Sequence, residues 1–280
     1  MASNDTFSHR IPNNTAFKSK IGTGLFKSHS STPFVGCQFS CGRSRTNSNR
    51  LPWESGIKYG GWGGHEYFEM NPGLDRNPVI FVHGLNRDAC DWYDMAQYLL
   101  DTEFNGDELW GITFNSPAPS HSEMAYQLDD FIKNVKDETG CNECTVIAHS
   151  LGVTGVRFWL SEYSRYDWID TFIGLAGANH GIEYARISSK YEFGIDNPIF
   201  QFLRSDYDDI PNHPLKELND DETPGNIDYY TLRGDLDALF LGKNSTSPIL
   251  EGATNEALPV THDGVREHSR AKQQIYKWLS

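Results

Sequence analysis

Residues 145–153 read Thr-Val-Ile-Ala-His-Ser-Leu-Gly-Val, and this stretch decides the fold. A short apolar run at 145–148 enters a turn in which small residues, Ala148 and Gly152, flank Ser150. Residues 151–164 then follow at helical spacing. A small-x-Ser-x-small turn between a buried strand and a helix lifts the serine above the carboxyl end of the sheet. Such short strings also occur by chance, but this placement favours Ser150 as a nucleophile beside a helix N-terminus that stabilises negative charge.

A second signal lies upstream, at the end of the apolar run 78–84, which reads Pro-Val-Ile-Phe-Val-His-Gly. In acyl-transfer enzymes of this architecture, the N–H after such a His-Gly pair and the N–H after the nucleophile stabilise the oxyanion. Here these donors are Leu85 and Leu151. The alternative is that His83 and Gly84 only end a strand in a turn.

The rest of the chain alternates between strand-like and helix-like segments. Strands are expected at 78–84, 109–114, 145–148, 169–175, 228–232 and 256–259, and helices at 89–101, 122–138, 151–164 and 264–279. Strands separated by helices of this size predict a mostly parallel sheet with helices on both faces. We therefore expect a single doubly wound α/β domain.

One of ten histidines is expected to act as the base. His262 lies between the last strand and the last helix, where the chain order Ser…Asp…His puts the base. His149 is inside the turn and is expected to point away from Ser150. His180 is interpreted as a loop residue near the site.

Four segments together resemble a known family: PVIFVHG (78–84), AHSLGV (148–153), FIGLAGANHG (172–181) and THDGV (261–265). They are similar to the class 2 lipases, which are α/β-hydrolases, and more closely to extracellular short-chain polyhydroxyalkanoate depolymerases, in which a segment similar to YGGWGG (59–64) precedes the first strand. Ala148 departs from the Gly found in most such turns. The resemblance covers about residues 59–265. It implies a serine hydrolase of ester bonds that uses no cofactor and no metal, with Ser150 as nucleophile and Leu85 and Leu151 as oxyanion donors.

The triad acid has two candidates, Asp235 and Asp237, which follow the expected strand at 228–232. In resembling hydrolases the acid stands three positions after a Gly and before an apolar pair, and this pattern selects Asp237. Asp235 is expected instead to accept from backbone N–H groups of its own turn.

The 280 residues carry 24 Lys plus Arg and 38 Asp plus Glu, a net charge of −14. This charge argues against nucleic acid or an anionic membrane as the main partner, and no apolar run approaches the ~20 residues that span a bilayer. Residues 1–60 hold eight of the cations and two of the anions, so residues 61–280 carry 16 and 36, a net of −20. An acidic domain of this kind is expected to gain stability in salt.

Residues 1–58 are rich in Ser and Asn and show no sustained apolar period, so we expect a basic, extended or disordered leader before a catalytic domain at 59–280. A transit peptide is the alternative interpretation of this leader. No secretory segment is visible, which indicates a cytoplasmic protein, whereas the resembling family is commonly secreted. The sequence leaves the oligomeric state open.

The five cysteines include two close pairs, Cys37 with Cys41 and Cys141 with Cys144. Zinc ligation, local disulfides and free thiols are the alternatives for these pairs.

About fifty residues separate the fourth strand from the strand at 228–232, and they are rich in aromatic side chains. The part at 182–225 is expected to form a lid or cap over the site, or a helical subdomain that packs on itself. We expect a serine carboxylic-ester hydrolase that acts on an ester lipid or a polyester. The alternative is a non-catalytic binding protein of the same fold.

Overall fold

The computed structural model describes residues 53–54, 59–190 and 197–280, so most of the predicted leader, including Cys37 and Cys41, lies outside the described residues. The two described residues of that leader form strand β1 (Trp53–Glu54). In the described part, no helix is both long and apolar enough to cross a membrane.

Within the described ranges, one sheet of eight strands, in the order β1-β2-β4-β3-β5-β6-β7-β8, forms the centre of the molecule. The other strands are β2 (Gly60–Gly63), β3 (Val79–Val82), β4 (Leu109–Thr113), β5 (Cys144–His149), β6 (Ile169–Leu175), β7 (Asp228–Gly234) and β8 (Thr254–Leu258). Strands β3 to β8 pair in parallel, whereas β1 and β2 pair antiparallel at one edge. The predicted fold class is therefore confirmed, with an antiparallel extension.

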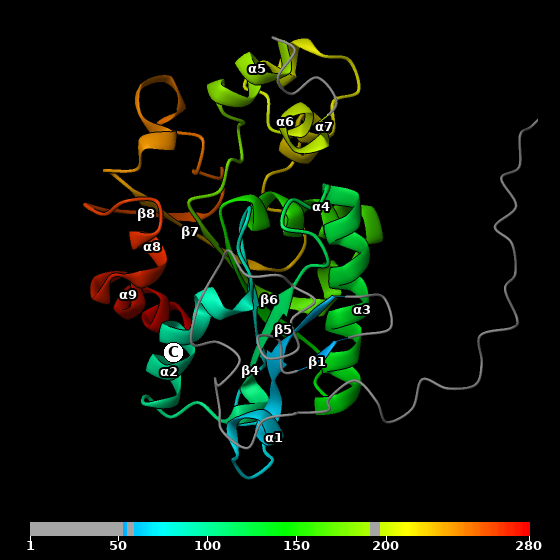
Figure 1. The fold of residues 1–280 in the computed structure, drawn as a ribbon, viewed down its shortest axis with the longest axis vertical. Coiled ribbons are helices and arrows are strands. Elements are labelled where there is room, and N and C mark those ends of the chain that lie inside the picture. Colours follow the sequence, from blue (N-terminus) through cyan, green and yellow to red (C-terminus); the bar gives the residue numbers. More distant parts are fainter. Residues whose placement is uncertain (1–52, 55–58, 191–196) are drawn as a thin grey trace, which may run out of the picture.

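Helices cover both faces of this sheet, as predicted. In Figure 1, α3 and α4 lie on one side, and α2, α8 and α9 on the other. Their bounds are α1 (Gly64–Phe68), α2 (Tyr93–Leu100), α3 (His121–Thr139), α4 (Leu151–Tyr163), α8 (Gly264–Glu267) and α9 (Ser269–Leu279). Two expected helices are interrupted: 89–101 begins with the 3₁₀ helix η2 (Ala89–Trp92), and 264–279 is divided at His268. His268 has extended backbone and caps α9 through its side chain, which accepts from the N–H of Arg270.

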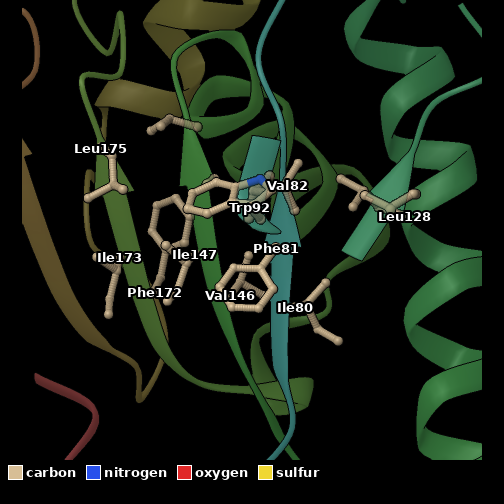
Figure 2. Close-up of a cluster of buried hydrophobic side chains, with 14 of the residues drawn as sticks. Ile80, Phe81, Val82, Trp92, Leu128, Val146, Ile147, Phe172, Ile173 and Leu175 are labelled. Atoms are coloured by element: carbon tan, nitrogen blue, oxygen red, sulfur yellow. The ribbon is translucent and has the colours of Figure 1, made fainter. Parts of the chain in front are cut away.

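The core lies where β3, β5 and β6 meet the covering helices. Figure 2 shows Phe81 of β3 beside Trp92 of η2, and the two ring centroids are 5.1 Å apart. Leu128 of α3 belongs to the same buried cluster. Because β3 and the middle of β5 are buried on both faces, they read as short apolar runs without alternation, whereas β6 has the partly exposed Asp170 and Thr171 near its start.

The insertion between β6 and β7 holds α5 (Glu183–Lys190), α6 (Pro198–Phe202) and α7 (Pro214–Asn219) and lies beyond the carboxyl ends of the strands (Figure 1). Part of it packs on the core: the Phe202 ring stacks on His121 of α3, with centroids 3.4 Å apart. Tyr184 and Ile187 of α5 are exposed. The insertion thus combines packed and exposed apolar residues, and whether it opens as a lid stays a prediction.

Candidate active site

Ser150 occupies the turn between β5 and α4 in a strained conformation, with φ 55° and ψ −122°. Glycine neighbours create the space for this turn. A Cβ added to Gly152 would come within 2.6 Å of the carbonyl oxygen of His83, and one added to Gly84 within 2.9 Å of the Ser150 Cβ. The small residue at 152 is therefore required by the close approach of α4 to the end of β3, as the sequence predicts.

Ser150, His262 and Asp237 form one hydrogen-bonded line, although they lie on three different loops. The Ser150 hydroxyl is 2.9 Å from Nε2 of His262, and Nδ1 of His262 is 2.6 Å from Oδ2 of Asp237. A carboxylate only accepts hydrogen bonds, so Nδ1 carries the proton and Nε2 is free to accept from the serine. This is the arrangement needed for a base that takes the serine proton.

The Asp237 carboxylate is buried, and both of its oxygens have partners. Oδ2 holds His262, and Oδ1 accepts from the N–H of Leu239 at 2.9 Å, which caps the short 3₁₀ helix η6 (Ala238–Phe240). Asp235 is half exposed and pairs with the guanidinium of Arg233 at 2.8 Å. The expectation that Asp235 accepts from its own turn is wrong. Asp237 makes the backbone cap instead, because its Oδ1 accepts from Leu239 while its Oδ2 is directed inward to His262.

The two predicted oxyanion donors lie beside the serine. Leu151 is the first residue of α4, so its N–H has no acceptor within the helix. Leu85 follows Gly84, whose backbone lies against Ser150. Leu151 thus follows the serine at the start of α4, and Leu85 lies in the loop that follows β3.

His83, which the sequence analysis singled out only as part of a His-Gly pair, has a definite structural part. Its Nε2 accepts from the N–H of Phe114 at 3.1 Å, so its Nδ1–H donates to the carbonyl oxygen of Gly84 at 2.8 Å. This bond holds the peptide between Gly84 and Leu85, whose N–H belongs to Leu85. The ring is buried and packs against Phe114.

His149 contacts the loop that carries His262. Its Nε2–H donates to the backbone carbonyl of His262 at 3.0 Å, and the two ring centroids are 4.8 Å apart. Complete burial and the nearby His262 ring hold the pKa of His149 well below its usual value, so the ring is neutral. His149 is thus a support for the loop that carries His262.

A surface ion pair joins the two loops on the other side of the site. The Arg87 guanidinium contacts both oxygens of Asp263, at 3.0 and 2.8 Å. Arg87 follows the Leu85 loop, and Asp263 follows His262. Sequence reasoning missed this pair because its two members are 176 positions apart.

The remaining histidines among the described residues have structural partners. His180 contacts Glu222 at 2.7 Å, His65 contacts Asp107 at 2.7 Å, and His213 contacts the carbonyl of Gln201 at 2.9 Å. His121 contacts Thr154 at 2.9 Å. In the described ranges, no group of three or more His, Cys, Asp or Glu side chains is arranged to hold a metal ion.

Comparison with known proteins places this geometry in context. The family model described as Lipase (class 2) matches residues 76–161. Among solved structures, the mature form of Bacillus licheniformis lipase BlEst2 is similar with a TM-score of 0.59 and 18% identity, over 75% of this chain and 94% of that one. Its propeptide form gives 0.58 and 19%, over 75% of this chain and 51% of that one. Aspergillus fumigatus lipase B gives 0.54 and 15%, over 70% and 51%.

The structures share the fold, and the family model covers the segment that contains the His-Gly pair, the serine turn and most of α4. The predicted resemblance to lipases of the α/β-hydrolase type is confirmed, while the closer resemblance to polyhydroxyalkanoate depolymerases stays a prediction. The chain therefore has the α/β-hydrolase fold, and its residues 76–161 are similar to the class 2 lipases.

Proposed function

We propose that the protein is a serine carboxylic-ester hydrolase that forms an acyl-enzyme on Ser150. The observation that carries this proposal is the continuous line from Ser150 through His262 to the buried Asp237. In the first step, His262 Nε2 takes the hydroxyl proton while Oγ attacks the ester carbonyl carbon. His262 then gives this proton to the leaving alcohol, and a water molecule activated by the same nitrogen hydrolyses the acyl-enzyme.

The negative charge that develops on the carbonyl oxygen needs donors that are already in position. We assign this role to the N–H groups of Leu151 and Leu85, the former at the N-terminus of α4. Asp237 keeps the imidazole in the tautomer that accepts from serine and stabilises the imidazolium. His262 is 23% exposed on its side chain, so a substrate can reach the line from solvent.

The surroundings of the site favour an uncharged ester with an apolar part. Leu236 and Leu239, on either side of Asp237, are exposed, and so is Leu241. Asn244 links this segment to α5, since its Nδ2 donates to the Leu239 carbonyl and its Oδ1 accepts from the N–H of Glu183. The exposed leucines and the exposed side chains of α5 thus belong to connected elements. We assign an ester lipid or a polyester, such as a polyhydroxyalkanoate, as the substrate.

Labelling with a fluorophosphonate probe tests the proposed nucleophile. The folded protein should be labelled on its tryptic peptide 137–157, and Ser150→Ala should abolish the label. Protein unfolded in denaturant should also remain unlabelled, because the reaction needs the assembled line. Folded wild-type protein that takes no label would support the alternative, a non-catalytic binding protein.

Substrate class needs a separate measurement. A panel of nitrophenyl esters from C2 to C16, run beside a polyhydroxybutyrate clearing assay, distinguishes short from long acyl groups and a dispersed ester from a solid polymer. Clearing by the wild type but not by Ser150→Ala would identify a polyester depolymerase. Hydrolysis of the dispersed esters without clearing would restrict the activity to lipids and small esters.

A further inference from the structure

A pair of thiols lies at the end of the molecule away from the candidate active site. Cys141 is in the turn after α3, and Cys144 is the first residue of β5. Both are free thiols, and their Sγ atoms are 3.6 Å apart. Cys141 is partly exposed, whereas Cys144 is fully buried. Ser150 follows the opposite end of β5, so the hydrogen-bonded line of Ser150, His262 and Asp237 does not include either thiol.

The turn between α3 and β5 brings the two sulfur atoms together. Gly140 ends α3 with φ 71°, and the N–H of Cys141 donates to Oγ1 of Thr139 at 3.4 Å. The Lys136 ammonium donates to the carbonyl of Asn142, which ties the tip of the turn back to α3. The neighbouring β5–β6 register shifts between Cys144 and Thr145, so the strand begins with an irregularity at the buried thiol.

The two thiols have opposite acid–base properties. A hydrogen bond from Cys144, helped by Thr139 and the Lys136 charge, lowers the pKa of Cys141 to about 6. Bonding to Cys141 and burial raise the pKa of Cys144. At neutral pH an accessible thiolate therefore stands beside a protected thiol, which is the division between an attacking and a resolving cysteine.

We propose that Cys141 and Cys144 are a redox-active dithiol, which low-molecular-weight disulfides such as glutathione disulfide convert reversibly into an intramolecular disulfide. The Cys141 thiolate attacks one sulfur of the oxidant, forms a mixed disulfide and releases one thiolate. Cys144 then loses its proton and attacks Sγ of Cys141, which expels the second thiolate. The two protein thiols are oxidised to one disulfide with loss of two protons, and the oxidant disulfide is reduced to two thiols.

This disulfide would join the turn after α3 to the first residue of β5. Its closed loop is short, so it removes only a little entropy from the unfolded chain and should raise the melting temperature by a few degrees. The serine turn lies at the other end of β5, so ester hydrolysis should change less than about twofold on oxidation.

Tryptic cleavage makes the reaction measurable, because Cys141 and Cys144 are the cysteines of peptide 137–157, which contains no internal Lys or Arg. The full-length folded protein is treated with glutathione disulfide at pH 7, quenched in acid, alkylated under denaturing conditions and analysed by mass spectrometry. We expect this peptide to escape alkylation and to weigh two hydrogen atoms less than its reduced form. Dithiothreitol should restore both thiols.

Single variants separate the two steps. Cys144→Ser should trap one glutathione on Cys141, and Cys141→Ser should leave the buried Cys144 unmodified. Cys141 in the Cys144→Ala variant should still react with iodoacetamide faster than buried Cys90, which serves as the protected control. A wild-type peptide that keeps both thiols, or that stops at a stable glutathione adduct, would overturn the proposal. So would a folded protein that holds zinc at the two cysteines and thereby resists oxidation.

Discussion

The two aspartates after β7 differ by position alone, yet the molecule gives them separate surroundings. Asp237 is buried with both oxygens engaged, whereas Asp235 is half exposed beside Arg233. The Gly-x-x-Asp spacing therefore indicated the right carboxylate for the contact with His262. The backbone cap by Asp237 could not be derived from sequence, because it depends on which oxygen the imidazole occupies.

Exchanging each carboxylate for an amide tests this difference. Asp237→Asn should lower kcat of ester hydrolysis by on the order of 10³–10⁴ with KM little changed, because the amide favours the wrong imidazole tautomer. Asp235→Asn loses an exposed ion pair and should stay within about threefold of the wild type. Steady-state kinetics on a nitrophenyl ester, with circular dichroism to verify folding, give the answer. A large loss in Asp235→Asn with an active Asp237→Asn would reverse the assignment.

At the scale of elements, β3 could be predicted from a continuous apolar run that ends at Gly84, and β5 from the apolar run that enters the serine turn. Strand β2 was missed: residues 60–63 are Gly-Gly-Trp-Gly, which lacks the β-branched residues that mark a strand. Gly63 there has φ 154°, and a Cβ would lie 2.4 Å from the Trp110 ring. The glycine at this position is required by an antiparallel strand that packs against an indole.

The junction of β3 with α4 gives an element-scale prediction. Gly152→Ala adds a Cβ within 2.6 Å of a backbone oxygen and should destabilise the protein by about 1–3 kcal/mol, although alanine favours helices. Gly73→Ala is the matched control, because no heavy atom lies within 4 Å of its added Cβ. Chemical denaturation of both variants measures the difference. An unchanged midpoint in Gly152→Ala would show that α4 and β3 separate easily.

For the molecule as a whole, two buried histidines link stability to pH. Burial lowers the pKa of His121 from 6.5 to about 3, and burial lowers that of His149 as well. Each ring stays neutral in the folded state and takes up a proton when the chain unfolds. Their contribution is therefore fully present above pH 6.5 and decreases as the pH falls from 6.5 toward 3.

His121→Gln isolates one of these protons. Below pH 6, the unfolding free energy of the wild type should decrease by up to about 1.4 kcal/mol per pH unit for each histidine. The slope for the variant should be smaller by the contribution of one histidine. Urea titrations from pH 7 to pH 5 measure the slopes, in a range where most carboxylates stay ionised. Parallel curves for the two proteins would contradict this assignment.

The charge of residues 61–280, a net of −20, acts on the same global equilibrium. Repulsion between like charges destabilises the compact state, and added salt screens it over a Debye length of about 10 Å at 0.1 M. We expect the melting temperature to rise between low and molar NaCl. An uncharged osmolyte at equal osmolality separates screening from water exclusion. A melting temperature that stays flat or falls as NaCl is added would contradict the expectation that salt stabilises this acidic domain.

The left-handed conformation of Ser150 has a consequence for selection. A glycine at this position should relieve about 1–3 kcal/mol of backbone strain, offset in part by the greater freedom of glycine in the unfolded chain. Ser150→Gly should therefore melt higher than Ser150→Ala, which removes the hydroxyl and keeps the strain. Selection for stability alone would therefore replace the serine at position 150. A lineage that keeps serine here has a lower free energy of unfolding than it could have, and only selection for the hydroxyl keeps the serine in place.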